Sequence, residues 1–123
     1  MNRLLKFSLL AIVLSFMPWV QAHEGHNHMP VTMKKAVEIA LATTADYTRK
    51  APPFGLPQLD ESWRNLPASA AQIHENGRGY YVVGIANPAQ AKTLYLRILL
   101  DGSVDAANFS GVFAPSAPTS SAE

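Results

Sequence analysis

The sequence contains no cysteine among its 123 residues. This absence excludes disulfides, thiolate metal ligands and thiol catalysis. It also excludes a lipoprotein anchor, which is attached to a cysteine at the cleavage site. Because a small domain without disulfides must rely on its core, we expect a compact and well-packed fold.

The sequence also lacks an apolar run long enough to cross a membrane. The longest run extends from Phe7 to Met17 and is shorter than the ~20 residues that a spanning helix needs. It follows the cations Arg3 and Lys6 and ends close to Ala22. These features predict a cleavable secretory signal over residues 1–22, with an uncleaved anchor as the alternative.

The sequence has no large excess of positive or negative charge, because its net charge is only +1. Cleavage after Ala22 would remove Arg3 and Lys6 and leave eight cations against nine acids, a net charge of −1. A chain with this net charge has no electrostatic attraction to nucleic acid or to an anionic membrane surface, so neither is predicted as a partner.

The part of the chain after the signal is long enough for one domain with a single core. We place that domain at residues 31–113. It follows a flexible His-rich segment at 23–30 and precedes a tail at 114–123, whose composition predicts disorder.

Residues 31–47 have the pattern of an amphipathic helix, with Thr32 as candidate N-cap. One face contains side chains at three- and four-residue steps: Met33, Ala36, Val37, Ala40, Leu41 and Thr44. Prolines then interrupt the chain at 52–57. After them, Asp60 can cap a short helical turn that points Trp63 inward.

The remainder predicts antiparallel strands joined by short turns. The expected strands are Ala70–Glu75, Tyr80–Ala86, Thr93–Leu100 and Ser103–Phe109. Asn76 to Gly79 is predicted as a tight turn on the strength of its Asn-Gly pair, and Asp101-Gly102 closes another hairpin. The fold class is therefore α+β, with one amphipathic helix packed on a three- to four-stranded antiparallel meander sheet whose other face is partly exposed to water.

The strongest chemical signal lies directly after the predicted cleavage site. His23, His26 and His28 fall within six residues, with Glu24 between the first two. Neutral imidazole binds Cu²⁺ and Zn²⁺, and short His-rich tracts are typical of metal binding. We therefore predict a divalent metal site, with the three histidines as nitrogen ligands and Glu24 as an oxygen ligand.

Cleavage after Ala22 would strengthen this prediction. The free α-amine and the imidazole of His23 could then chelate one ion together, an arrangement that suits Cu²⁺. The tract is not a His-Glu-x-x-His motif on a helix, so the metalloprotease interpretation does not apply. The alternative is a solvated polar spacer whose histidines bind nothing specific.

The other polar residues predict structure rather than catalysis. His74 is expected to be an ordinary strand histidine, and Tyr80, Tyr81 and Tyr95 to make cross-strand aromatic contacts. The sequence shows no defensible Ser-His-Asp set and no glycine-rich phosphate loop. We therefore predict no active site and no enzymatic activity.

The predicted elements carry a family resemblance. Its segments are Met33 to Ala40, Leu59 to Trp63, Gly79 to Val83, Lys92 to Leu96 and Asp101 to Gly111. They resemble a family of small exported bacterial proteins of unknown function with a His-rich N-terminus. The helix followed by hairpins also resembles PepSY-type domains more weakly. The resemblance implies the periplasm of a Gram-negative bacterium and a link to metal resistance, and it implies no site residues.

Two functional hypotheses remain from the sequence. The first is a periplasmic accessory protein that binds copper or zinc through its N-terminal histidines. The second is a PepSY-like module that binds or inhibits a periplasmic protein partner and has no role in metal binding.

Overall fold

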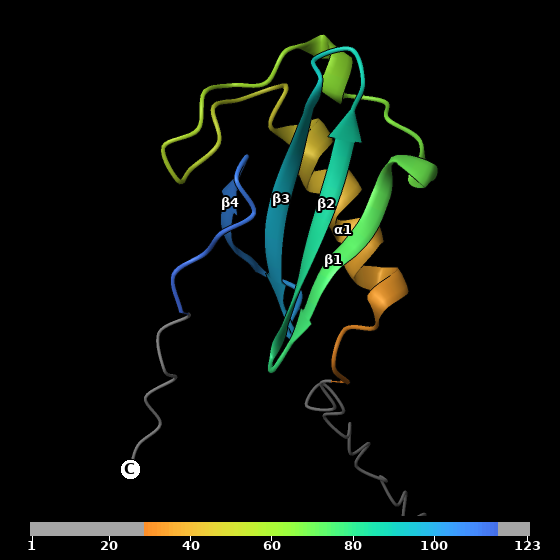
Figure 1. Cartoon of the computed structure of the whole chain (residues 1–123), viewed down its shortest axis with the longest axis vertical. Helices are drawn as coiled ribbons and strands as arrows, with labels where there is room; N and C mark the ends of the chain where they lie inside the picture. Colours follow the sequence, from red (N-terminus) through yellow and green to blue (C-terminus); the bar gives the residue numbers. More distant parts are fainter. Residues whose placement is uncertain (1–28, 116–123) are drawn as a thin grey trace, which may run out of the picture.

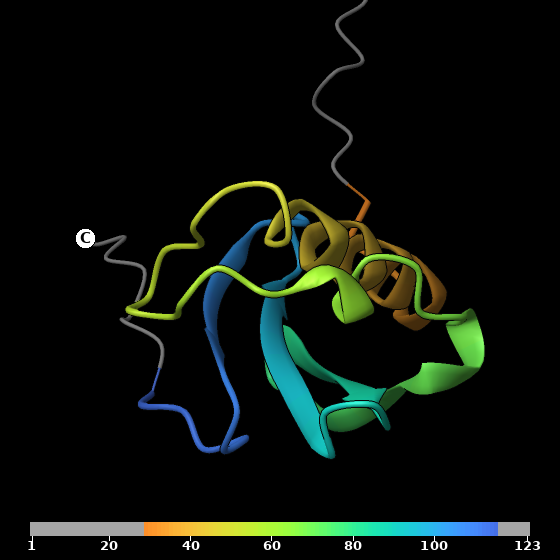
Figure 2. The same ribbon diagram turned by 90° about the horizontal axis from the view of Figure 1, so that it is seen from above.

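The structure is a computed structural model that describes residues 29–115. One helix, α1 (Met33–Asp46), lies across one face of a four-stranded sheet (Figures 1 and 2). The strands are β1 (Ala71–Gly77), β2 (Tyr80–Asn87), β3 (Lys92–Leu99) and β4 (Val104–Asn108). They pair antiparallel in the order β1-β2-β3-β4. The predicted α+β meander is confirmed.

The start and the buried stripe of α1 follow from its sequence. The Thr32 hydroxyl accepts a hydrogen bond from the Lys35 amide at 3.1 Å, which confirms the predicted N-cap. Ala36, Ala40 and Thr44 are the buried residues of α1. The Thr44 hydroxyl donates to the Ala40 carbonyl at 2.8 Å, so this buried polar group is satisfied within the helix.

Met33 was predicted on this apolar face, and that prediction is wrong. Its side chain is 47% exposed. Met33 is the first residue of α1, and the buried stripe begins only one turn later, at Ala36. The periodic pattern places residues on a face, but it does not show where the packed part of that face begins.

The core lies between α1 and one face of the sheet. The alternation in β2 and β3 points the predicted residues inward. Five aliphatic side chains are fully buried there: Val83, Ile85, Leu94, Leu96 and Ile98. Complete burial of each such side chain contributes about 1.5–3 kcal/mol, so these residues supply much of the stabilisation of the domain.

The segment between α1 and β1 closes one end of this core. It contains two short 3₁₀ helices, Glu61–Trp63 and Ala68–Ala70. The Asp60 side chain caps the first by accepting from the Ser62 amide at 2.9 Å, as predicted. Trp63 is buried, and its ring lies 5.9 Å from that of Phe109, beyond β4. The tryptophan therefore joins the connecting segment to the last strand.

The β1–β2 hairpin turns later than its Asn-Gly pair predicts. Asn76 and Gly77 still belong to β1, and the turn residues are Arg78 and Gly79. Gly79 has φ +90°, a conformation that favours glycine. A Cβ on Gly77 would collide with the ring of Tyr80 on the paired strand. Gly77 therefore makes room for that ring instead of forming the turn.

Among residues 29–115, no helix is long and apolar enough to span a membrane.

Candidate functional site

The predicted metal ligands lie outside the part of the chain that the structure describes. His23, Glu24, His26 and His28 all precede Met29, the first described residue. Their role therefore stays a prediction. What the structure does describe is the point at which this tract joins the domain.

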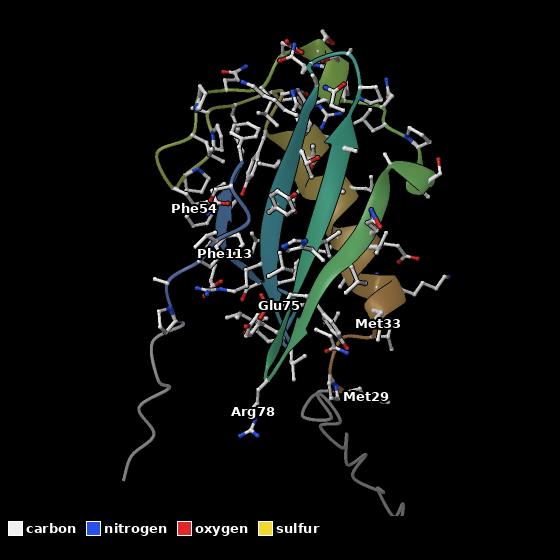
Figure 3. All side chains as sticks on the ribbon, viewed as in Figure 1. Met29, Met33, Phe54, Glu75, Arg78 and Phe113 are labelled. Atoms are coloured by element: carbon white, nitrogen blue, oxygen red, sulfur yellow. The ribbon has the colours of Figure 1, made fainter. Side chains whose placement is uncertain are left out.

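That junction is held to the sheet as well as to the helix. The Val31 amide donates to the Leu100 carbonyl at 3.0 Å, just after the end of β3. Thr32 then caps α1. Met29 precedes both contacts and is 77% exposed. The His-rich tract is thus attached to a fixed position, while the residue that joins it to the domain faces solvent (Figure 3).

The described residues offer no competing metal site. Among residues 29–115, no group of three or more His, Asp or Glu side chains could hold a metal ion. His74, the one histidine after residue 28, stands on β1 without convergent carboxylates or imidazoles. A single imidazole does not make a zinc centre, because structural and catalytic zinc sites have at least three protein ligands.

The main candidate surface among these residues is the sheet face opposite α1, here called the open face. It is shaped by two β-bulges, one in each edge strand. In β1, Ile73 pairs with Val83 and Glu75 with Val82, which leaves His74 as the extra residue. The bulge places His74 and Glu75 together opposite Val82, so these two neighbouring side chains share the open face.

The His74 ring contacts the Tyr95 ring there in a tilted arrangement, with ring centroids 4.7 Å apart and an angle of 57° between the planes. The Tyr95 ring lies over Gly84, the residue paired with it across the sheet. A Cβ on Gly84 would come within 3.1 Å of that ring, so the glycine allows this close approach. The two rings border a hollow of about 240 Å³ that also includes Gln72 and Thr93.

The second bulge builds a charged cluster beside the hollow. In β4, Ala106 pairs with Arg97 and Val104 with Ile98, so Asp105 is the extra residue. Its carboxylate accepts from Arg97 Nε at 2.8 Å and from Nη2 at 3.1 Å. This bidentate pair raises the pKa of Arg97, and the hydrogen bonding that Arg97 donates to Asp105 is the largest cause.

Arg97 also holds the C-terminal part of the described chain. Its Nη1 donates to the Ala114 carbonyl at 2.6 Å, and its guanidinium lies 5.4 Å from the ring centroid of Phe113. The centroid of the Tyr80 ring lies 5.7 Å from the same guanidinium. Arg97 is only 7% exposed, so it serves as an internal clamp and not as a receptor for a dissolved anion.

Tyr80 on β2 connects this cluster to Glu75 on β1. Its hydroxyl donates to a Glu75 carboxylate oxygen at 2.7 Å, and this hydrogen bond is the main reason its pKa is raised. Of the three tyrosines expected to make cross-strand aromatic contacts, Tyr95 makes one, with the His74 ring. Tyr80 contacts Arg97 and Tyr95 contacts His74, while Tyr81 packs against the core on the opposite face.

Sequence reasoning missed the pairing of Arg97 with Asp105. An available signal was the arginine in the middle of an otherwise apolar strand, since such a charge requires a partner when it is buried. The bulge that supplies Asp105 leaves no mark in the alternating pattern.

Comparison with known proteins identifies a family whose function is unknown. No curated protein and no solved structure matches the chain. The match to a protein family extends over residues 1–112 and so covers most of the sequence. The protein therefore belongs to the family of unknown function DUF6488.

Proposed function

We propose that this is an exported periplasmic protein that binds divalent copper or zinc through its N-terminal histidines. The observation that carries the proposal is the sequence of the tract itself. His23, His26 and His28 supply three imidazoles within six residues, directly after a signal-like segment at 1–22. Glu24 adds a carboxylate oxygen, and a link to metal resistance accords with such a role.

Copper is favoured over zinc if the signal is cleaved after Ala22. The new α-amine and the His23 imidazole then form one chelate, and His26 and His28 complete a nitrogen-rich set. Among divalent first-row ions, Cu²⁺ binds such ligands most strongly. The free N-terminus is therefore part of the proposed site.

The folded domain supports this proposal as a stable carrier. Its buried polar groups have partners within the chain: Arg97 pairs with Asp105, and the buried Asn87 side chain donates to the Ser62 hydroxyl at 2.9 Å. The domain therefore folds around its own contacts, and a metal bound to the tract would be added to a structure already formed.

Isothermal titration of the exported protein with Cu²⁺ and Zn²⁺ tests the proposal. We expect a dissociation constant below about 10 μM for at least one ion. The triple variant His23→Ala, His26→Ala, His28→Ala should lose this binding. His74→Ala is the matched control, because its exposed histidine lies on the sheet and should not contribute. Unchanged binding in the triple variant would refute the proposal.

A second candidate is a PepSY-like module that binds a periplasmic protein. The favouring observation is the hollow beside His74 and Tyr95, which leaves part of the open face available to a partner. This role predicts a stoichiometric partner that co-purifies in the presence of a chelator. His74→Glu should weaken that complex, whereas the triple histidine variant of the tract should retain it.

A further inference from the structure

The soft donor atoms of the chain are concentrated at one place. Met29 and Met33 are the only methionines after residue 22, and the chain has no cysteine. Three of the four histidines fall in the six residues before Met29. Apart from His74, every imidazole and thioether that remains after the predicted cleavage therefore lies between His23 and Met33.

The structure leaves both methionines at least partly exposed to solvent. The Met29 and Met33 side chains are 77% and 47% exposed, and both are directed toward the same end of the molecule (Figure 3). The neighbouring apolar residues Val31 and Val37 pack against the core instead. The core therefore accounts for these valines, but it does not account for two large exposed apolar side chains on either side of the Val31 contact.

Thioethers select soft metal ions. Methionine sulfur favours Cu⁺ over the harder divalent ions, whereas imidazole suits Cu²⁺ and Zn²⁺. From the exposure of Met29 and Met33 and their closeness in sequence to the His tract, we propose that they form a thioether site for a soft monovalent ion, Cu⁺. This inference deepens the proposed function, because the same N-terminal stretch would then accommodate both oxidation states of copper.

The positive charges around Met33 repel a divalent ion more strongly than a monovalent one. Met33 begins α1, where the helix dipole is positive, and it is followed by Lys34 and Lys35. Glu38 lies within 3.6 Å of one lysine ammonium and 3.5 Å of the other, and it offsets part of this charge. The remaining repulsion grows with the charge of the bound ion, so it acts twice as strongly on Cu²⁺ as on Cu⁺.

Silver provides a redox-inert probe for this site. The exported protein, labelled with ¹³C at the methionine methyl groups, is titrated with Ag⁺ and followed by NMR. We expect the methyl resonances of both Met29 and Met33 to shift. The double variant Met29→Leu, Met33→Leu should bind Ag⁺ roughly tenfold more weakly or worse, with its Cu²⁺ affinity nearly unchanged.

This design separates the two proposals. Leucine conserves volume at exposed positions, so the fold should be retained, and circular dichroism checks that it is. Methyl resonances that stay fixed at saturating Ag⁺, or a double variant that binds Ag⁺ as the parent does, would overturn the thioether site. Cu²⁺ binding by the triple histidine variant tests the proposed function alone: its loss supports that function, its retention refutes it, and neither result bears on the thioether site.

Discussion

Arg97 and Asp105 face each other across neighbouring strands, and two hydrogen bonds of 2.8 and 3.1 Å join the guanidinium to the carboxylate. The arginine side chain is nearly buried, and the aspartate side chain is 28% exposed. The pair exists because the bulge in β4 turns Asp105 toward β3. It links the last strand and the C-terminal segment to the middle of the open face.

We predict that Asp105→Ala destabilises the protein by about 3 kcal/mol, because it leaves a buried guanidinium without its counter-charge. Chemical denaturation followed by circular dichroism measures the change. Glu38→Ala is the control, since Glu38 pairs with two lysines on the exposed surface of α1 and should cost about 0.5 kcal/mol. Equal losses in the two variants would contradict the assigned role of the buried pair.

The contact between Gly77 and Tyr80 should appear as a strong coupling. Gly77→Ala forces the Tyr80 ring to move, which breaks its hydrogen bond to Glu75 and should cost about 1 kcal/mol. In a Tyr80→Ala background the same change should be neutral or stabilising, because alanine is favoured over glycine within a strand. A double-mutant cycle measures the difference, and additive effects would rule out the packing described.

Asp60 gives a prediction about pH. Its carboxylate accepts from the Ser62 hydroxyl at 2.6 Å, and this bond is the main reason its pKa lies below the usual value of about 4. When the pKa of Asp60 is lower in the folded protein than in the unfolded chain, the ionised carboxylate stabilises the protein at any pH above the unfolded-state pKa. This contribution is lost as the pH falls through the folded-state pKa. NMR titration of the carboxyl carbon should therefore give a low pKa, and Asp60→Asn should reduce the loss of stability below pH 4. A normal or raised value would contradict the hydrogen-bonded cap.

Export gives a prediction about mass. Protein recovered from the periplasm should begin at His23, and intact-mass spectrometry determines this directly. Acetylation of the His23 α-amine should weaken Cu²⁺ binding, since the blocked amine could no longer join the imidazole in one chelate. If the recovered chain begins elsewhere, the chelate is excluded and only an ordinary histidine cluster remains.

Much of the fold could be predicted because its signals are local. The Thr32 and Asp60 caps and the alternation of Leu94, Leu96 and Ile98 each depend on residues close in sequence, and each is confirmed. The prediction for Met33 failed because the periodic pattern does not show where along the helix the packing against the core begins. The prediction that Gly77 forms the turn failed because the role of this glycine depends on the ring of Tyr80, which lies on the paired strand.

The open face was harder to predict because its key residues come from bulges. An alternating pattern assigns each side chain to one of two faces, and one extra residue reverses that assignment locally. In β1 the bulge puts Glu75 on the open face beside His74, and in β4 it puts Asp105 there beside Ala106. The metal prediction remains independent of these features, because its residues precede Met29.

The same two bulges affect how this protein can meet another one. They interrupt β1 and β4, the strands at the two margins of the sheet. A guest strand aligned along either margin would lose its hydrogen-bond register halfway, so continuous backbone pairing with a neighbour is disfavoured. Recognition by this domain would then depend on side chains, and copies of it at high concentration would have little tendency to join their sheets into fibrils.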